Sequence, residues 1–391
     1  MHSEVKIHER HDVTVKRLRV LMVAPSFDIL GGQSVQAARL FERLKEEPSL
    51  EIDFLPINPR LPGVLRQLQR IKYVRTVVTS VAYVASLLLR AFRYDVLHVF
   101  SASYFSFVLA PTPAILIGKL YGRRVLLNYH SGEAEDHLRR WRGTAIPTIR
   151  LVDSIIVPSE YLVRVFASFD LDAHPIYNLI DTRRFRFRDR IPTRPNFLSN
   201  RNFETHYGID KILHAFAIIQ QEIPEATLTV AGDGSQREAL HALAAELGLK
   251  NTTFLGPVDP NLMPGIYDAT DVYLNASEID NQPLSLLEAF ACGIPIVTTD
   301  AGGIPYIVTN GVNGIIVRCG DVDELARQAI ALSRNPDSAK QMIDRGRKEC
   351  EKYSWTAVRD SWLSVYHQLA NSNSVAQIEP LKNSQPKVAS E

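Results

Sequence analysis

The chain has 391 residues, a net charge of +1 at pH 7 and a hydrophobic fraction of 46%, which is typical of a folded globular protein. It is too long for one ordinary core and predicts two domains of about 200 residues or less each. The three cysteines, Cys292, Cys319 and Cys350, are widely spaced and indicate neither a disulfide framework nor a metal cluster. Residues 1–20 are charged and lack the apolar core of a signal peptide, so a cytoplasmic protein is expected.

The first half of the chain alternates apolar strand-like segments with helical ones. An apolar strand is predicted at 18–24, followed by Gly31 and Gly32 and by helical spacing from Ser34 to Leu44. Further strands that end in small polar residues are predicted at 94–102, 123–132 and 152–159. Strands alternating with helices predict a parallel sheet covered on both faces.

Charge is distributed unevenly along the chain. Residues 1–190 carry 28 basic and 19 acidic side chains, a balance of +9, and the remainder carries −8. No acidic residue lies between Asp53 and Asp95, a window that holds the basic residues Arg60, Arg66, Arg70, Lys72, Arg75, Arg90 and Arg93. Its uncharged run at 76–89 has 14 residues, too few to span a bilayer.

Two interpretations of this window, residues 54–94, remain open. It is either a core helix with solvated arginines or a basic amphipathic surface held at an anionic membrane. Nucleic-acid binding is disfavoured because the sequence shows no aromatic stacking platform and no nucleic-acid-binding motif.

The second half repeats the alternating pattern after an Arg- and Pro-rich linker at 178–196. Strands are expected at 226–234 and 252–258, a helix at 237–249, and a helix followed by a strand at 262–277. The expected organisation is an N-terminal domain (1–185), a C-terminal domain (186–352), a helix that crosses back to the N-terminal domain (353–370) and a disordered tail (371–391). In two such doubly wound domains, ligands bind where the strand ends face a shared cleft.

The segment DNQPLSLLEAFACGIP, residues 280–295, predicts a helix that begins near Pro283 and ends at Gly293. Glu288 lies on the same helical face as Leu284 and other apolar residues. A carboxylate buried there must neutralise, reach solvent or accept hydrogen bonds. Glu288 is therefore a functional candidate.

Other candidate motifs are weaker. AGDGSQ around Gly232 matches a dinucleotide fingerprint only in part, because Arg237 stands at the third glycine position. The Asp-x-Asp pairs at 170–172 and 321–323 are typical of a turn and a helix cap. No Walker loop, HExxH or GxSxG motif occurs. Neither a metal nor a cofactor is expected.

Several motifs, taken in order, resemble glycosyltransferase family 4, the retaining GT-B glycosyltransferases also called the group one type. They are the Gly31–Gly32 loop, His130 at a strand end, VPSEY, IYNLIDTRRF, the segment at 280–305, NGVNGIIV and a late YSW. The resemblance covers about residues 18–370. It implies an α/β protein of GT-B architecture, with two Rossmann-like domains facing a central cleft.

The resemblance also implies roles for individual residues. Glu288 would accept hydrogen bonds from the donor's ribose, and the start of its helix would face the diphosphate. The implied catalytic residues are His130, Arg201, Asp280 and Glu288. The implied donor-binding residues are Gly31, Gly32, Arg201, His206, Val258, Asn281, Gln282, Pro283, Leu284, Ser285 and Glu288.

The sequence departs from the family at the donor site. Asp280 stands where the family has Glu, Asn281 and Gln282 stand where Gly and Phe are usual, and His206 replaces a lysine. These changes put the donor's identity in question and leave two hypotheses open. One is a metal-independent enzyme that moves a sugar, with retention, from a nucleotide-diphosphate donor to a lipid-linked or polysaccharide acceptor at the inner face of a membrane. The other is a catalytically silent homologue that binds such ligands as a regulatory or assembly subunit. An epimerase on the same architecture is disfavoured.

Overall fold

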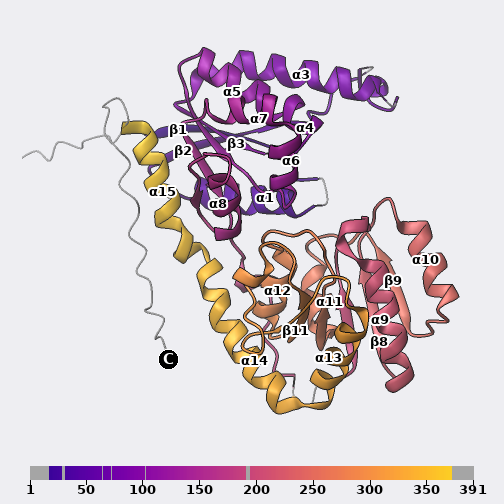
Figure 1. The fold of residues 1–391 in the computed structure, drawn as a ribbon. Coiled ribbons are helices and arrows are strands. Elements are labelled where there is room, and N and C mark those ends of the chain that lie inside the picture. The colour runs from indigo at the N-terminus through magenta and orange to yellow at the C-terminus, as the bar shows by residue number, and fades with distance from the viewer. Residues whose placement is uncertain are drawn as a thin grey trace, which may run out of the picture.

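The computed structural model describes residues 17–28, 31–63, 65–71, 73–101, 103–190 and 194–371. They form two α/β domains, each built on a six-stranded sheet, with a gap between them (Figure 1). This confirms the predicted fold class. Lys72 and the expected tail from residue 372 onward lie outside the described residues.

The N-terminal sheet is parallel throughout. Across the sheet its strands are β2 (Leu50–Pro56), β1 (Leu18–Ala24), β3 (Val96–Phe100), β4 (Arg124–Asn128), β5 (Ser154–Val157) and β6 (His174–Pro175). The strand order reverses between β1 and β3, and ligands of open α/β sheets bind outside the carboxyl ends of the strands at such a point. The Gly31–Gly32 loop that follows β1 therefore lies where a ligand is expected.

Alternate residues of β1 enter two different cores. Val20 and Met22 pack into one that includes Leu40, whereas Leu21 and Val23 pack into the other. The helices of this domain are α1 (Gly32–Lys45), α2 (Leu65–Leu68), α3 (Val74–Arg90), α4 (Phe105–Leu109), α5 (Pro111–Leu120), α6 (Ala134–Arg140), α7 (Arg142–Ile149) and α8 (Glu160–Ala167). The sheet is thus covered on both faces, as the alternating sequence pattern predicts.

The C-terminal sheet has the same kind of strand order. Its strands are β12 (Ile315–Val317), β11 (Ile296–Thr299), β10 (Val272–Leu274), β7 (Asn196–Ser199), β8 (Thr227–Ala231) and β9 (Thr252–Gly256). Its helices are α9 (Ile209–Glu222), α10 (Arg237–Glu246), α11 (Met263–Ala269), α12 (Leu284–Cys292), α13 (Val322–Arg334) and α14 (Pro336–Cys350). Here the switch point lies between β7 and β10, so the segments that follow these two strands reach the gap between the domains.

The last helix, α15 (Trp355–Asn371), packs against the N-terminal sheet (Figure 1). Trp362 and Tyr366 are buried there, and Tyr366 places its hydroxyl 2.6 Å from Nδ1 of His98 on β3. Asn128 lies 3.1 Å from the other ring nitrogen of His98. The chain therefore crosses between the domains once more near its end.

Helix α3 differs from the other helices in its exposure. Together with the 3₁₀ turn at Ala91–Arg93 it forms a helical segment of 20 residues, Val74–Arg93, which is long and apolar enough to cross a membrane by length and composition alone. The helical segment is thus longer than the uncharged 14-residue run from which the sequence analysis judged it too short to span a bilayer. Only Tyr83 and Leu87 of α3 are buried, so one face of the helix packs into the core and the opposite face is open to solvent.

Stability should fall in acid because His98 is buried in its neutral form. Burial, helped by the nearby His130, lowers the pKa of His98 from 6.5 to about 3. Between these two pH values the unfolded chain binds a proton that the folded chain does not, so the free energy of unfolding falls as the pH drops from about 6.5, by about 1.4 kcal/mol per pH unit for this group. Chemical denaturation at several pH values gives the free energy of unfolding as a function of pH. This free energy should fall less steeply with decreasing pH in His98→Gln than in the wild type. The exposed His214 on α9 provides the control, and an equal change of slope in His214→Gln would contradict the assignment.

Candidate functional site

A cavity of about 890 Å³ lies between the domains and is lined by residues of both. Every site residue named from the sequence lines it: Gly31, Gly32, His130, Arg201, His206, Val258, Asp280, Asn281, Gln282, Pro283, Leu284, Ser285 and Glu288. These residues come from segments as distant in the sequence as Gly31 and Glu288. The strand order brings them together at the carboxyl ends of the two sheets.

Helix α12 presents its N-terminus to the cavity. Pro283 occupies the N-cap position, and Gly293 ends the helix in a left-handed conformation with φ of 70°. The first amide groups of a helix have no partner within it, so this end favours an anion. The sequence suggests one apolar face, but every residue from Ser285 to Cys292 is buried, and the aromatic ring of Phe290 packs closely on Gly346 of α14.

Glu288 is satisfied by two side chains of the protein. Its Oε1 accepts a hydrogen bond from Nη2 of Arg39 on α1, at 2.7 Å, and its Oε2 accepts one from the hydroxyl of Tyr267 on α11, at 2.9 Å. The Arg39–Glu288 pair spans the two domains, with side chains only 9% and 10% exposed. The carboxylate therefore does not need a ligand to offset its burial, although its remaining lone pairs can still accept hydrogen bonds.

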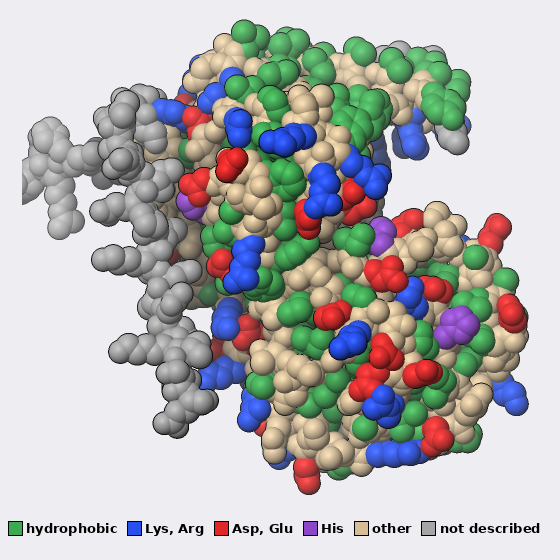
Figure 2. All heavy atoms as spheres, in the orientation of Figure 1, with side chains coloured by type: hydrophobic (Ala, Val, Ile, Leu, Met, Phe, Trp, Pro, Cys, Tyr) green, Lys and Arg blue, Asp and Glu red, His purple; other side chains and the backbone are tan. Residues whose placement is uncertain are grey.

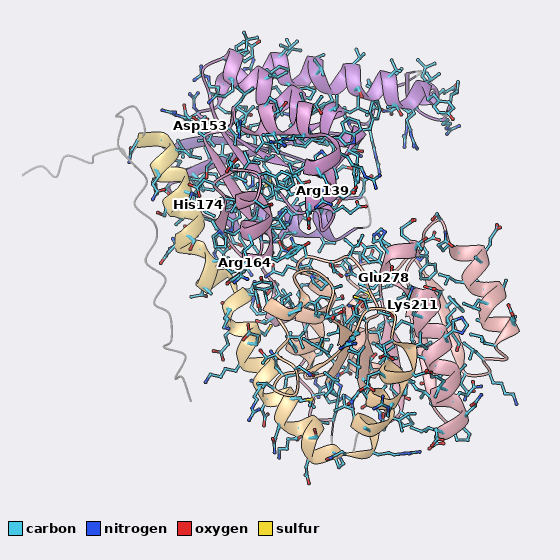
Figure 3. The ribbon with its side chains drawn as sticks, viewed as in Figure 1. Arg139, Asp153, Arg164, His174, Lys211 and Glu278 are labelled. Atoms are coloured by element: carbon cyan, nitrogen blue, oxygen red, sulfur yellow. The ribbon has the colours of Figure 1, made fainter. Side chains whose placement is uncertain are left out.

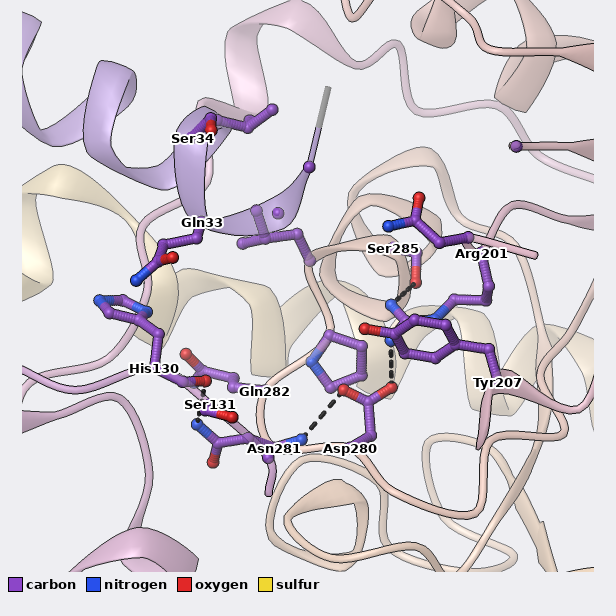
Figure 4. Close-up of a pocket in the computed structure, with 18 of the residues that line it drawn as sticks. Gln33, Ser34, His130, Ser131, Arg201, Tyr207, Asp280, Asn281, Gln282 and Ser285 are labelled. Carbon is purple, nitrogen blue, oxygen red and sulfur yellow. Dashed lines mark hydrogen bonds and ion pairs between the residues drawn. The ribbon is translucent and has the colours of Figure 1, made fainter. Parts of the chain in front are cut away.

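Arg201 follows β7 and is clamped in place by the residues around it (Figure 4). It forms an ion pair with Asp280, its Nη1 donates to Oγ of Ser285 at 3.4 Å, and its guanidinium lies 4.3 Å from the centre of the Tyr207 ring. Its carbonyl oxygen packs on Gly232, where an added Cβ would approach it to 2.2 Å. The AGDGSQ glycine thus supports the Arg201 loop.

Arg201 keeps its positive charge in spite of its burial. Burial alone would lower its pKa, but the neighbouring Asp280 carboxylate outweighs burial and the pKa lies above the ordinary arginine value. Within the described part of the chain, the buried Nε of Arg201 has no hydrogen-bond partner. A permanent cation with an unused donor therefore stands beside the start of α12.

His130 lies at the end of β4 and stacks on Phe100, with ring centres 5.2 Å apart. Burial lowers its pKa to about 3, so the imidazole is neutral at physiological pH. Among the described residues, no group hydrogen-bonds its buried Nε2. Figure 4 shows Gln33, from the start of α1, beside the His130 ring.

Asn281 and Gln282 line the cavity, and their side chains also form hydrogen bonds with the N-terminal domain. The Asn281 side-chain oxygen accepts a hydrogen bond from the Ser159 hydroxyl, and the Gln282 side-chain oxygen accepts one at 2.7 Å from the backbone N–H of Asn178. At Gly303 an added Cβ would lie 2.0 Å from the Asn281 carbonyl oxygen. The absence of a side chain at Gly303 thus allows the backbone of the segment after β11 to approach Asn281 closely.

A second hollow of about 730 Å³ adjoins the cavity and shares Asp280 with it. Arg139 of the N-terminal domain and Glu278 of the C-terminal domain line its opposite sides (Figure 3). Glu278 also binds Nζ of Lys211 at 2.8 Å, and its backbone N–H donates to the carbonyl oxygen of His206. This second space is polar and charged.

The described residues contain no group of three or more His, Cys, Asp or Glu side chains placed to hold a metal ion. Of the two Asp-x-Asp pairs, Asp321 caps α13 by accepting a hydrogen bond from the Glu324 N–H at 3.0 Å, as predicted. Asp170 has a positive φ of 56° just after α8, which agrees with its assignment to a turn.

Two family models match consecutive parts of the chain. One, described as Glycosyltransferase Family 4, matches residues 30–184, and the other, described as Glycosyl transferases group 1, matches residues 181–349. The chain belongs to glycosyltransferase family 4.

Curated relatives of the family 4 chain carry out different reactions, as their names indicate. It is 29% identical over 220 residues to the N-acetyl-alpha-D-glucosaminyl L-malate synthase of Bacillus anthracis, covering 54% of this chain and 53% of that protein. It is 27% identical over 293 residues to the glycogen synthase of Mycobacterium tuberculosis, covering 71% and 69%. The family 4 chain thus spans about half the length of the first relative.

Solved structures share the GT-B fold with the family 4 chain. Sucrose-phosphate synthase from Thermosynechococcus elongatus superposes with a TM-score of 0.73 at 18% identity, covering 90% of this chain and 99% of that one. Anabaena HepE in complex with UDP-glucose superposes with a TM-score of 0.70 at 18% identity, covering 90% and 100%. At this identity the likeness concerns the fold alone.

Sequence reasoning missed Arg39, Tyr207 and Tyr267 in this family 4 chain. Arg39 lies on α1 beside the buried Leu40, and the two tyrosines lie in segments without a recognisable motif. An arginine on a mostly buried helix face was the one available indication, since a buried charge needs a partner. That partner, Glu288, is 249 positions away.

Proposed function

We propose that this chain transfers a sugar from a nucleotide-diphosphate donor to an acceptor, with retention of the anomeric configuration. One observation carries the proposal: the α12 N-terminus, the buried cation Arg201 and the carboxylate Glu288 line one cavity at the junction of the domains. Together they offer a site for an anionic diphosphate and an acceptor of hydrogen bonds for a ribose.

In the proposed reaction, the diphosphate lies against the α12 N-terminus and Arg201, and the ribose hydroxyls donate to Glu288. Negative charge grows on the departing phosphate as the bond to the sugar breaks, and the fixed cation and helix dipole stabilise it. The neutral His130 lies at the reacting sugar, where its Nε2, which has no hydrogen-bond partner among the described residues, can serve a hydroxyl group. The contribution of the protein is positioning and electrostatic stabilisation, without a protein nucleophile.

For the acceptor, we propose a saccharide that is lipid-linked or part of a growing polysaccharide, handled by a cytoplasmic protein at the inner face of a membrane. The second hollow supports a saccharide, because its charged and polar groups suit a hydroxyl-rich ligand. Among the structural neighbours, one is a pneumococcal O-GlcNAc transferase in complex with UDP and GlcNAc. That ligand pair combines a nucleotide with a saccharide, as proposed here.

The second candidate is a silent homologue that binds the donor without transferring its sugar. Two observations favour it: Asp280 is already held by Arg201, and Glu288 by Arg39. A donor must share or displace these contacts before it can react. Release of free nucleotide on addition of an acceptor separates the two candidates, because a silent homologue binds the donor and releases none.

The proposed function is tested by a thermal-shift screen against UDP, GDP and ADP sugars in the presence of excess chelator. A ligand at about 100 times its Kd adds about 2.7 kcal/mol of stability. We expect one nucleotide class to raise the Tm with chelator present, because the proposed diphosphate contacts involve no metal. The same nucleotide with Arg201→Ala is the control and should give a smaller shift. No shift with any nucleotide sugar, or a shift that requires a divalent ion, would overturn the proposal.

A further inference from the structure

The outer face of α3 is apolar and open to solvent. Val77, Val81 and Leu89 are 64%, 64% and 68% exposed, and they recur at multiples of four residues, so they form one stripe along the helix. Further exposed apolar side chains flank the stripe: Val74, Leu88 and Phe92 from the same segment, and Leu116 and Leu120 from α5. Exposed apolar side chains gathered on one surface in this way mark a site of interaction with a protein or a membrane.

The apolar stripe has a basic border. Four arginines near the stripe are exposed: Arg66 in α2, Arg70 just after it, Arg75 at the start of α3 and Arg93 in the 3₁₀ turn that follows α3. The acidic residues that flank the window are engaged elsewhere: Asp53 with the Tyr94 hydroxyl and Asp95 with Arg19. Figure 2 shows hydrophobic side chains along the upper edge of the N-terminal domain, over α3, with basic side chains at its right-hand end.

From this pairing of an apolar stripe with a basic border, we infer that α3 lies in the interface of a bilayer that contains anionic lipids. The segment Val74–Arg93 has 20 residues and so runs for about 30 Å along the surface. Its apolar side chains enter the acyl boundary and the arginines meet the anionic headgroups. In a two-fold dimer formed through α3 the apolar stripes would match, but the four exposed arginines would face the arginines of the second copy.

The helix lies on the bilayer and does not cross it. Tyr83 and Leu87 are fully buried in the N-terminal core, and the Tyr83 hydroxyl donates to the Ala110 carbonyl oxygen at 2.8 Å. A crossing would remove both side chains from this core. With this face docked, only the opposite stripe is available to lipid.

The surface is connected to the cavity by a short length of chain. Ile57 and Asn58 line the cavity, and the chain reaches α2 at Leu65 and α3 at Val74. Figure 1 places α3 on the side of the N-terminal domain away from the C-terminal domain, with one end projecting beyond the body of its own domain. This inference rests on the proposed function for its purpose, since an acceptor carried by a lipid would lie in the same bilayer as the bound protein.

The test is co-sedimentation of the full chain with vesicles of phosphatidylcholine alone or mixed with phosphatidylglycerol, at about 0.05 M and about 0.5 M salt. We expect binding to the anionic vesicles that weakens but persists at high salt. Arg66→Gln with Arg70→Gln and Arg75→Gln should weaken it about a hundredfold at low salt, at about fivefold per charge. Val81→Gln with Leu89→Gln should remove most of the binding that persists at high salt.

Matched controls come from the C-terminal domain. Leu255→Gln with Val312→Gln replaces the same two residue types at exposed positions there, and Arg237→Gln with Arg327→Gln and Arg334→Gln removes three exposed arginines. Neither control should change vesicle binding. Effects of the α3 variants no larger than those of the controls would overturn the inference. So would a wild type that stays in the supernatant, or a dimer in solution that the Val81 and Leu89 substitutions dissociate.

Nucleotide-sugar affinity separates this inference from the proposed function. The α3 variants should bind the donor as the wild type does, because no substituted residue lines the cavity. Vesicle binding without any donor affinity would contradict the proposed function and support the membrane-binding surface. Donor affinity without vesicle binding would support the proposed function and contradict the membrane-binding surface.

Discussion

Replacement of Arg201 by alanine is expected to lower turnover by about 10²–10³-fold, and to lower it more than donor affinity. The reason is that charge on the diphosphate is greatest as the bond to the sugar breaks, and removal of one preorganised donor to such a charge has an effect of this size. Steady-state kinetics with the nucleotide sugar identified by the thermal screen provides the measurement, as separate values of kcat and KM. A loss of donor affinity with unchanged kcat would show that Arg201 contacts the donor equally in the ground state and the transition state.

This variant also leaves the buried Asp280 carboxylate without its cation, which can cost about 3–5 kcal/mol of stability. The double variant Arg201→Ala with Asp280→Asn removes that charge as well and should recover stability without recovering turnover. Recovery of turnover in the double variant would instead show that Arg201 serves only to neutralise Asp280. Arg188→Ala provides a matched control, because Arg188 pairs with the buried Asp271 at 3.0 Å in the same domain, outside the cavity lining.

Replacement of Glu288 by glutamine is expected to weaken binding of the nucleotide sugar by about tenfold to a hundredfold. Hydrogen bonds to a charged acceptor contribute about 1.5–3 kcal/mol, and glutamine keeps the shape of the side chain without its charge. Isothermal titration with the donor gives the affinity directly. Unchanged affinity in the folded variant would remove the ribose assignment.

The Arg39–Glu288 ion pair offers another explanation for such a loss of affinity, because the substitution also weakens a contact between the domains. Glu288→Gln is therefore also measured in an Arg39→Ala background, as a double-mutant cycle. If the ribose contacts Glu288, the loss persists in both backgrounds; if Glu288 acts only by holding Arg39 across the cleft, the loss disappears without Arg39. Glu47→Gln is the control, since Glu47 is 7% exposed and paired with Arg359 of α15 away from the cavity. It should leave donor affinity unchanged.

The sequence by itself determined the elements that depend on local patterns. The alternation of apolar strands with helices predicted two parallel sheets, and Pro283 and Gly293 predicted the ends of α12 to within one residue. These features follow from backbone geometry and from periodicity over a few residues, so a single chain reveals them.

Only the tertiary structure decided which side chains meet. Arg39 reaches Glu288 because α1 and α12 face each other across the gap, and Asn281 is held by Ser159 of the other domain. Likewise, the sequence of α3 could not show which of its faces would be covered by the core and which would be left open to solvent. Burial and pairing between distant segments are set by how the two sheets and their helices pack, and no local pattern encodes that arrangement.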